Sequence, residues 1–407
     1  MSEPTNHRPA DAAQLRELVA WAVAEERPLE IAGNGTKRIV GRPVEAEHRV
    51  SVQALSGITL YEPDELVMSA LAGTKLATIE AELAERGQEL MFEPADWGLL
   101  LGVAPESQTI GGVFAANVAG PRRVKAGAAR DHLLGLHCVT GHGQEIKTGG
   151  RVVKNVTGYD LCKLLAGSWG TLAVMTQVTF KVMPRCEASA TLLVTGGGEA
   201  ALLGVLRAAM GSPCEVSGAA LLPPLAAGRS QVRALRRHAR ATAAIRLEGF
   251  GPSVAYRLDL LKKLLAGPGF EFAALEGDDT RTLWREIRDV RLIHPERMLW
   301  RLSVPPAAAS ELVDWTASVT SERLFDWAGG LIWLAPKDDW ARDAGTVREA
   351  LAGRSGHATL MRAPSWLRLE AAPFEPQPLA LRALTERVKR SFDPHGVLNP
   401  GRMYAGI

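Results

Sequence analysis

Two segments of the sequence decide the fold: residues 105–120, which read PESQTIGGVFAANVAG, and residues 167–182, which read GSWGTLAVMTQVTFKV. In the first segment two adjacent glycines stand before a run of small residues that we expect to be helical. Unsatisfied N–H groups at the start of a helix attract negative charge. In the second segment two glycines precede an alternating strand, and a backbone without Cβ atoms lets a flat ligand approach closely. Each pair alone fits an ordinary turn, but together they indicate one elongated, phosphate-bearing cofactor.

Length and composition set the class of protein. A chain of 407 residues with 46% hydrophobic and 23% charged residues is typical of a globular protein of two or three domains. The net charge of +2 gives no argument for a nucleic-acid or membrane-surface partner, and no apolar run reaches the ~20 residues of a membrane span. The first nine residues lack the apolar core of a secretory signal. The four cysteines are far apart, which predicts reduced thiols, a cytoplasmic location and no metal site or iron–sulfur cluster in this chain.

A polar, glycine-rich turn at residues 33–38, Gly33-Asn-Gly-Thr-Lys-Arg38, is a second candidate phosphate loop. Its backbone N–H groups and two cations could hold a diphosphate. It has neither the spacing of a Walker A loop nor the third glycine and following helix of the Rossmann fingerprint. Alone, it would also fit a surface hairpin.

Strands and helices alternate through the first third of the chain, which indicates an α+β or α/β domain. After Pro184 the alternation continues with few such glycine turns, and we expect a ferredoxin-like second domain. Residues 379–392 predict an amphipathic helix, followed by a series of turns. Five arginines between residues 229 and 240 would share one face if that segment is helical, forming either a contact for an acidic partner or a solvated face.

Six motifs follow one another in a specific order: 33–38, Thr109-Ile-Gly-Gly112, Arg130–Gly135, Lys154-Asn-Val-Thr-Gly-Tyr-Asp160, Gly167–Thr171 and Leu398-Asn-Pro-Gly-Arg402. In this order the sequence resembles the vanillyl-alcohol-oxidase superfamily with its PCMH-type FAD-binding domain. Within it the sequence is similar to the E-subunit family of bacterial glycolate oxidase. The resemblance covers residues 10–185 and the extreme C-terminus, and residues 300–306 and 356–360 extend it through the middle.

The resemblance implies an α+β fold with three parts. Residues 1–185 would form the two-subdomain FAD-binding domain, residues 186–373 a ferredoxin-like cap for substrate or a partner, and residues 374–407 a helix and turns that return to the FAD domain. The cofactor would be FAD, and its two phosphate charges suit two amide-rich loops and Lys37. Because the first loop has no histidine or cysteine, we expect the FAD to be non-covalent. The implied FAD contacts are Gly33, Asn34, Gly35, Thr36 and Lys37 in the first loop, Pro105, Thr109, Gly111, Gly112 and Asn117 in the second, Gly170, Thr171 and Val174 on the closing strand, and Asn399 and Gly401 near the C-terminus.

Oxidation of a 2-hydroxy acid needs a cation for the carboxylate and a base for the hydroxyl proton. The candidate cations are Arg301 and Arg362, and the candidate base is His357. A structural salt bridge is the alternative role for Arg301. The related catalytic subunit of glycolate oxidase carries a histidine-rich motif near its C-terminus. The nearest stretch here, 353–360, has one histidine, so the flavin of this chain could be a catalytic or a relay centre.

The resemblance implies an FAD-binding subunit that oxidises glycolate to glyoxylate, with a paralogous FAD subunit and an iron–sulfur subunit as partners. The expected location is the cytoplasm, or the inner membrane surface through those partners. Two alternatives stay open: a stand-alone FAD-linked dehydrogenase of another hydroxy acid or alcohol, and a redox-silent assembly subunit.

Overall fold

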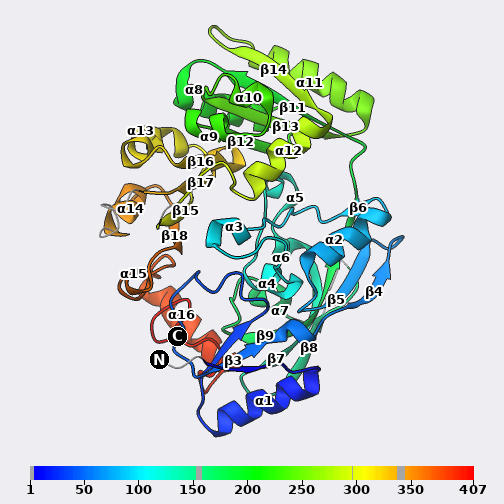
Figure 1. Ribbon diagram of the computed structural model, residues 1–407, viewed down its shortest axis with the longest axis vertical. Coiled ribbons are helices and arrows are strands. Elements are labelled where there is room, and N and C mark those ends of the chain that lie inside the picture. The colour runs from blue at the N-terminus through cyan, green and yellow to red at the C-terminus, as the bar shows by residue number, and fades with distance from the viewer. Residues whose placement is uncertain (1–3, 153–157, 296, 337–343) are drawn as a thin grey trace. The chain divides into compact units, whose positions relative to one another are not determined.

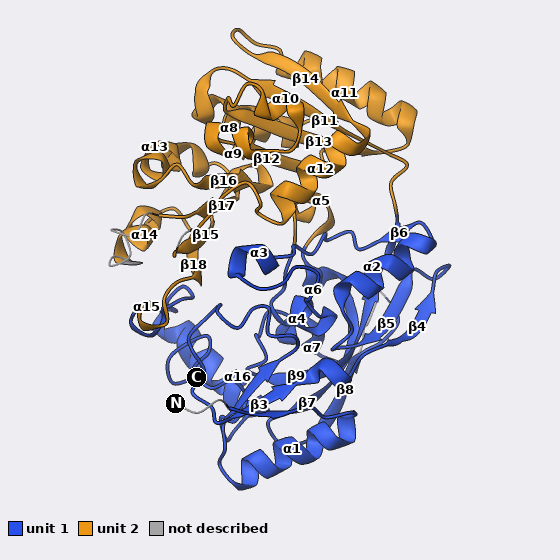
Figure 2. Ribbon diagram, viewed as in Figure 1, with its two compact units in different colours: residues 1–118, 128–184, 368–407 blue, residues 119–127, 185–367 orange. Residues whose placement is uncertain are grey.

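The computed structural model describes residues 4–152, 158–295, 297–336 and 344–407. Residues 154–157 of the Lys154–Asp160 motif therefore lie outside the described residues. The chain divides into two compact units: unit 1 holds residues 1–118, 128–184 and 368–407, and unit 2 holds residues 119–127 and 185–367 (Figure 2).

Two short segments differ from the expected division. Residues 119–127 belong to unit 2, although we expected them in the FAD-binding domain. Arg122 explains this, because its guanidinium donates two hydrogen bonds to the Glu248 carboxylate of the same unit, at 2.7 and 2.9 Å. Residues 368–373 belong to unit 1 rather than to the cap, and Arg368 there donates to the Gly41 carbonyl oxygen at 3.2 Å.

Unit 1 contains three sheets (Figure 1). A parallel sheet has the order β1-β3-β2, an antiparallel sheet has the order β4-β5-β9-β7-β8, and β10 pairs with β6. The strands are β1 (Thr5–His7), β2 (Leu29–Ala32), β3 (His48–Ser51), β4 (Ile58–Glu62), β5 (Val67–Leu71), β6 (Gln88–Glu89), β7 (Leu133–Thr140), β8 (Glu145–Gly149), β9 (Ala173–Lys181) and β10 (Met183–Pro184). The helices are α1 (Ala12–Ala24), η1 (Val52–Ala54), α2 (Leu76–Glu85), α3 (Gly98–Leu101), α4 (Ile110–Ala115), α6 (Ala129–His132), α7 (Leu161–Leu165) and α16 (Leu379–Phe392).

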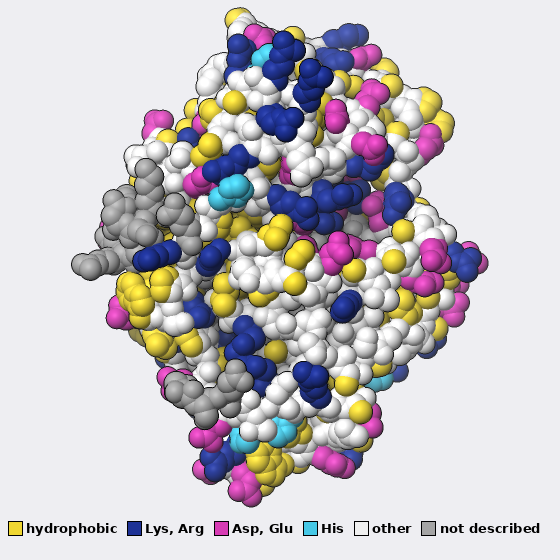
Figure 3. Space-filling model, viewed as in Figure 1, with side chains coloured by type: hydrophobic (Ala, Val, Ile, Leu, Met, Phe, Trp, Pro, Cys, Tyr) yellow, Lys and Arg dark blue, Asp and Glu magenta, His cyan; other side chains and the backbone are white. Residues whose placement is uncertain are grey.

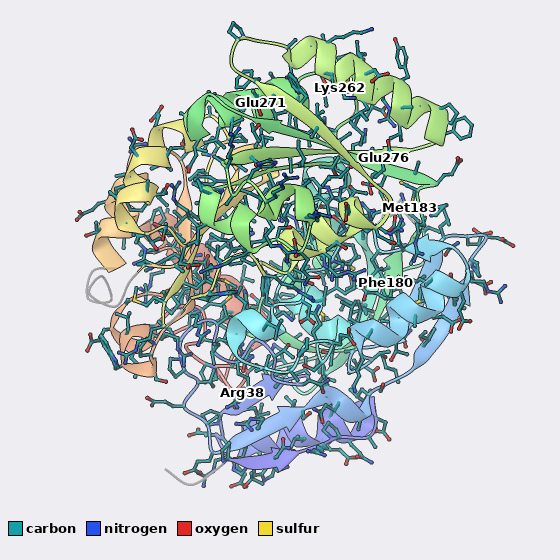
Figure 4. All side chains as sticks on the ribbon, turned by 45° about the horizontal axis from the view of Figure 1, so that its top comes forward. Arg38, Phe180, Met183, Lys262, Glu271 and Glu276 are labelled. Carbon is teal, nitrogen blue, oxygen red and sulfur yellow. The ribbon has the colours of Figure 1, made fainter. Side chains whose placement is uncertain are left out.

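The central strand β9 is buried along nearly its whole length, and α4 packs against it. Phe92, Phe114 and Phe180 form an aromatic cluster in this core, with neighbouring ring centroids 5.8 and 5.7 Å apart. Figure 4 labels Phe180 in unit 1.

The C-terminal segment returns to unit 1, as expected. Leu29 of β2 donates from its N–H to Val397 and accepts from the N–H of Asn399, so the end of the chain lies beside β2. The orientation of α16 was not expected. A buried Lys389 attaches it, donating to the Thr171 and Leu398 carbonyls and to Asp393, while its three leucines are exposed.

Unit 2 is built on one antiparallel sheet with the order β14-β11-β13-β12-β16-β17-β15-β18. Its strands are β11 (Ala188–Thr195), β12 (Gly218–Leu222), β13 (Thr242–Gly249), β14 (Glu271–Glu276), β15 (Leu299–Ser303), β16 (Arg323–Asp326), β17 (Leu331–Leu334) and β18 (His357–Arg362). Its helices are α5 (Arg123–Ala126), α8 (Gly198–Met210), α9 (Pro224–Arg229), α10 (Arg233–Arg236), α11 (Gly251–Leu265), α12 (Gly277–Arg288), α13 (Ala309–Val319), η2 (Trp327–Gly329) and α14 (Ala344–Leu351); α15 (Ser365–Glu370) spans the boundary to unit 1.

The sheet of unit 2 contains the ferredoxin-like order twice. If the four strands of each half are numbered in chain order, β11 to β14 lie side by side in the order 4-1-3-2. Strands β15 to β18 lie in the order 2-3-1-4, which is the same order read from the other edge. The two halves join where β12 meets β16, through the pair Leu221 and Phe325. We expected one ferredoxin-like domain; the chain has two that share one sheet. Glu271 and Glu276 mark the two ends of its edge strand β14 (Figure 4).

The arginines between residues 229 and 240 do not lie on one helix, because α9 ends at Arg229 and α10 covers only Arg233–Arg236. Arg229 forms an ion pair with Glu322. The other four are exposed, and Figure 3 shows Lys and Arg side chains gathered over this part of unit 2. Within the described residues, no helix is long and apolar enough to cross a membrane.

Candidate functional site

The two predicted phosphate loops of unit 1 lie side by side. The Asn34 side chain donates from Nδ2 to the Ser107 carbonyl at 2.5 Å, and Lys37 Nζ donates to Gln108 Oε1 at 2.9 Å. Gly33 is packed so closely on the second loop that a Cβ there would overlap Thr109 Oγ1. Glycine at position 33 therefore lets the two loops meet.

Both loops open on one pocket. All of its lining comes from unit 1. The lining residues are Ile31, Ala32, Gly33, Asn34, Gly35, Thr36, Lys37, Arg38, Val52, Ala72, Thr109, Gly111, Gly112, Ala115, Ala116, Trp169, Gly170, Ala173, Val174, Met175 and Arg402.

The first loop leaves its backbone donors available. Within the part of the chain that the structure describes, the N–H groups of residues 34–37 donate no hydrogen bond. Gly35 has φ +72°, a left-handed conformation that glycine adopts without steric cost. Donors of this kind beside a cation can bind an anion such as a diphosphate.

The second loop differs from the sequence prediction. Helix α4 begins at Ile110, so both glycines lie inside its first turn instead of before it. Their N–H groups are occupied: Gly111 donates to the Ala72 carbonyl at 2.9 Å, and Gly112 to Thr109 Oγ1 at 3.3 Å. Gly111 therefore allows close packing against Ala72. A Cβ at Gly111 would lie 2.7 Å from that of Ala72, whereas one at Gly112 would meet only Thr109 Oγ1, at 3.2 Å.

The turn before β9 forms another wall of the pocket. Trp169 and Gly170 both have positive φ, +56° and +71°. The side chain of Asn399 holds this turn, because Nδ2 donates to the Trp169 carbonyl and Oδ1 accepts from the Ile31 N–H, each at 2.8 Å. Asn399 is fully buried and connects the C-terminal turn, β2 and the Trp169–Gly170 turn behind the pocket.

Three cations line the pocket: Lys37, Arg38 and Arg402. Among the described residues, no carboxylate lines it. Arg38 is held by two hydrogen bonds to Glu30, at 2.7 and 3.1 Å. Burial is the main cause that lowers the pKa of Lys37 to about 8; Asp96 opposes this effect and the positive charge of Arg402 adds to it. The pocket therefore holds a concentrated positive charge in a buried setting.

Among the three cations of the pocket, Arg402 is the one to which the sequence assigned no role. Its Nη2 donates to the Lys37 carbonyl at 2.9 Å, and its guanidinium lies 5.5 Å from the ring centroid of Trp169. Burial, with the like charges of Arg38 and Arg368, lowers the pKa of Arg402 to about 10, although Glu30 opposes the shift. Its Nε is buried without a hydrogen-bond partner among the described residues. The sequence contained a signal for this residue, because Arg402 is the last residue of the C-terminal motif.

The candidate catalytic residues form a separate group in unit 2. The guanidinium groups of Arg301 and Arg123 lie 5.1 and 4.8 Å from the centroid of the Trp327 ring. Arg301 is half-buried and forms no ion pair or hydrogen bond within the described residues, so the salt-bridge alternative is not found there. Burial and the positive charge of Arg123 lower the pKa of Arg301 to about 10. Sequence reasoning missed Arg123 and Trp327, which lie far from Arg301 in the chain.

The other two candidates lie on the neighbouring strand. Arg301 on β15 is paired with Thr359 on β18, and Ser303 with His357, so Arg301 and His357 share one face of the sheet. A β-bulge shifts the register between Leu299 and Trp300, so that Arg362 pairs with Leu299 and lies on the same face as Arg301. His357 is exposed and Arg362 half-buried.

Comparison with known proteins identifies the family. A profile of the FAD binding domain matches residues 7–149. Glycolate oxidase subunit GlcE of Escherichia coli is 34% identical over 403 residues, which cover 98% of this chain and 99% of that one. The chain belongs to the GlcE family.

The match to this FAD-binding oxidoreductase family extends beyond GlcE itself. Glycolate oxidase subunit GlcD of Bacillus subtilis is 30% identical over 186 residues, 46% of this chain and 38% of that one. Among solved structures, p-cresol methylhydroxylase superposes with a TM-score of 0.71 at 14% identity, over 98% of this chain and 88% of that one. The PCMH-type α+β fold expected from the sequence is thus confirmed.

FAD, the cofactor of this family, fits the pocket of the GlcE-type chain by charge. Its diphosphate is an anion, and the pocket combines available N–H groups, three cations and one buried Nε without a partner. Ten of the fifteen predicted contacts line the pocket: Gly33, Asn34, Gly35, Thr36, Lys37, Thr109, Gly111, Gly112, Gly170 and Val174. The other five, Pro105, Asn117, Thr171, Asn399 and Gly401, lie outside its lining.

Two of these five residues, Thr171 and Asn399, hold a wall of the pocket, and Asn117 bonds to a segment outside it. Besides Asn399, Thr171 closes the turn after Gly170 with a hydrogen bond from its hydroxyl to the Ser168 carbonyl at 2.7 Å. Asn117, whose φ is +49°, accepts from the Arg130 N–H at 3.0 Å. These residues therefore hold neighbouring backbone in place, and their direct contact with FAD stays a prediction.

Proposed function

We propose that this chain is the FAD-binding subunit of a complex that oxidises glycolate to glyoxylate and passes the electrons to an iron–sulfur partner subunit. The observation that carries the proposal is the cation-lined, glycine-walled pocket in a chain that matches GlcE along its whole length. A paralogous FAD subunit of the GlcD type is the second partner we propose.

The chain's own residues would hold the cofactor in defined ways. The N–H groups of residues 34–37 would donate to the diphosphate, and Lys37 and Arg402 would balance its charge. The glycines at positions 112 and 170 would leave room for the flat parts of the molecule. When bound, FAD supplies a flavin ring that accepts a hydride equivalent.

Arg301 is our candidate for binding the substrate carboxylate. A guanidinium that stacks on an indole keeps its planar fork in a fixed orientation, which suits a bidentate carboxylate contact. Burial and, after it, the positive charge of the nearby Arg123 lower the pKa of Arg301, so an anion bound there would be favoured. His357, on the same face of the sheet, is the candidate whose ring nitrogen would take the hydroxyl proton.

The proposal is tested on the complex obtained by co-expressing this chain with the GlcD-type and iron–sulfur subunits of its host. We expect Gly112→Leu to remove flavin from this subunit, because the new side chain would enter the pocket, while unit 2 stays folded. Gly150→Leu is the matched control, since nothing lies within 4 Å of a Cβ there. Flavin retained at wild-type affinity in Gly112→Leu would contradict the assignment of the pocket.

The substrate site is tested with Arg301→Gln in the same complex. Loss of a charged hydrogen bond of roughly 1.5–3 kcal/mol should raise the KM for glycolate at least about tenfold while the flavin content stays unchanged. Arg236→Gln, on the exposed surface of unit 2, is the control. An unchanged KM in Arg301→Gln would exclude Arg301 as the carboxylate ligand. Turnover by the isolated chain on another hydroxy acid would support a stand-alone dehydrogenase, and a folded chain that binds no FAD would support an assembly subunit.

A further inference from the structure

The turn between β16 and β17 in unit 2 has a backbone that does not suit its residues. Trp327, Ala328 and Gly329 have φ values of +53°, +56° and +96°, and all three residues are buried. Hairpin turns with positive φ at two successive residues normally use Asn-Gly, Asp-Gly or Gly-Gly. In tryptophan and alanine the Cβ makes this conformation unfavourable. Such strain is typical of a segment that does more than connect two strands.

Three hydrogen bonds hold the turn and its indole ring. Asp326 Oδ1 accepts from the Trp327 N–H at 2.7 Å, and the Trp327 carbonyl accepts from the Gly330 N–H at 2.9 Å. The indole Nε1 of Trp327 donates to the Gly120 carbonyl at 3.0 Å. Gly120 lies in the segment of unit 2 that Arg122 attaches to the sheet. The ring is therefore fixed both by its own backbone and by a distant segment.

Two guanidinium groups lie on this fixed ring. Those of Arg301 and Arg123 are 5.1 and 4.8 Å from its centroid, and they come from β15 and α5. Burial and, after it, the positive charge of Arg123 lower the pKa of Arg301 to about 10. The negative face of an indole attracts cations. The Trp327 ring thus offsets part of the cost of placing two like charges close together.

We infer that Trp327 is a positioning residue, whose indole holds the guanidinium of Arg301 in the orientation that binds the substrate carboxylate. This inference rests on the proposed function, in which Arg301 binds that carboxylate. Among the described residues, no hydrogen bond or ion pair orients the Arg301 side chain. A long side chain loses rotamer freedom when it binds a ligand, and a ring that already restricts it reduces this cost. The strain of the turn is then explained, because glycine or asparagine at position 327 would provide no ring.

A purely structural role is the alternative for Trp327. Its ring is buried, and a buried indole also stabilises the core around it. The two roles differ in a measurable way. A positioning residue acts through Arg301, so its effect on substrate binding should disappear when Arg301 is replaced, whereas an effect through the fold should persist.

The test is a double-mutant cycle on the KM for glycolate, measured in the co-expressed complex. Trp327→Leu should raise KM about tenfold when Arg301 is present, but less than about twofold in the Arg301→Gln background. In both backgrounds Trp327→Leu should change kcat less than about threefold, because the lost contact serves binding. Trp366→Leu, at a tryptophan of unit 2 that is 48% exposed, is the matched control and should leave KM unchanged. Flavin content and the unfolding temperature of unit 2 show which variants are folded.

A second substitution covers the case in which Trp327→Leu does not fold. Trp327→Phe keeps an aromatic ring in the turn, but this ring attracts a cation less strongly and cannot donate to Gly120. We expect it to raise KM about threefold, and the increase should disappear in the Arg301→Gln background.

The other outcomes separate this inference from the proposed function. Equal increases of KM in both backgrounds would assign Trp327 to the fold and overturn the inference. An unchanged KM in Trp327→Leu beside a raised KM in Arg301→Gln would also overturn it, and would leave the proposed role of Arg301 in place. An unchanged KM in both single variants would refute that role and the inference with it. A wild-type complex that does not oxidise glycolate would refute the proposed function, on which the inference rests.

Discussion

The protonation of Lys37 depends on its burial in the pocket. Burial is the largest effect and lowers its pKa to about 8, so its ammonium group is charged at neutral pH but only narrowly. Its contacts with Gln108 and Thr36 do not supply an opposite charge. An anion bound in the pocket would favour the charged form and raise this pKa.

FAD affinity should therefore depend on pH. Since the diphosphate favours protonated Lys37, affinity should be at its full value below about pH 8 and should fall as the pH rises through that value, by up to about tenfold per pH unit. Fluorescence titration of the apoprotein with FAD at pH values on both sides of 8 measures this. Lys37→Met should bind more weakly and lose the dependence. Equal slopes in the two proteins would show that another group is responsible.

Residue spacing predicted much of this pocket, and its omissions have a physical reason. Gly33–Lys37 and Thr109–Gly112 are short motifs whose chemistry is local, so the sequence displayed them. Arg402 reaches Lys37 across 365 residues, and Arg123 meets Trp327 and Arg301 from a distant segment. Such contacts come from chain topology, which a linear pattern of residue types does not contain.

At the scale of elements, strand β13 illustrates how a buried carboxylate connects distant segments. Glu248 accepts two hydrogen bonds from Arg122, and Arg246 lies 3.4 Å from it. Burial alone would raise the pKa of Glu248, but Arg246 and Arg122 outweigh it and hold the pKa at about 2. Residues 119–127 are thereby attached to the sheet of unit 2.

This ion pair should contribute stability that the protein loses in acid. Because the folded pKa lies below the usual value of 4.5, the contribution is complete above that value and is lost as the pH falls from 4.5 toward 2. Glu248→Gln removes the negative charge of a buried carboxylate that two buried guanidinium groups share, and should cost unit 2 about 3–5 kcal/mol at neutral pH. Urea unfolding at several pH values should show the difference from wild type narrowing in acid. Glu271→Gln, at a carboxylate that is 74% exposed, should change little; a similar loss in both variants would contradict this role of Glu248.

The sequence pattern predicts the burial of some helices and strands better than that of others. The alternation of residues 174–182 correctly indicated strand β9, because a central strand is determined by its own side chains. The amphipathic pattern of residues 379–392 correctly indicated helix α16, whose inner side carries the buried Lys389 beside the half-buried Val388 and Phe392. The hydrogen bonds of Lys389 decide that orientation, and periodicity alone cannot reveal them. The β-bulge beside Trp300 likewise depends on how β15 pairs with β18, which periodicity alone cannot reveal.

At the scale of the whole molecule, the two units have separate cores. Leu15, Phe92 and Phe180 are fully buried in unit 1, and Trp300 and Phe325 in unit 2. The sheet of unit 2 repeats one supersecondary unit, so its stability comes from two ferredoxin-like halves joined at β12 and β16. The sequence indicated this fold type but not the repeat, because the two halves share a topology without an evident common motif.

Separate cores and a pocket lined by unit 1 alone lead to a prediction for the intact chain. A ligand that binds only the folded form stabilises it by about 2.7 kcal/mol at a hundred times its Kd. FAD at that level should raise the unfolding temperature of unit 1 by roughly 5–10 °C and leave that of unit 2 in place. Differential scanning calorimetry, with and without FAD, measures both transitions.

The two transitions are assigned with variants that act on one unit each. Glu248→Gln should lower only the transition of unit 2, since Glu248 and its partners Arg122 and Arg246 all belong to that unit. Gly112→Leu should abolish the FAD-induced shift of unit 1, since its new side chain would occupy the pocket. If FAD instead moved the transition that Glu248→Gln lowers, the cofactor would have to contact unit 2, and the pocket of unit 1 could not be its whole binding site.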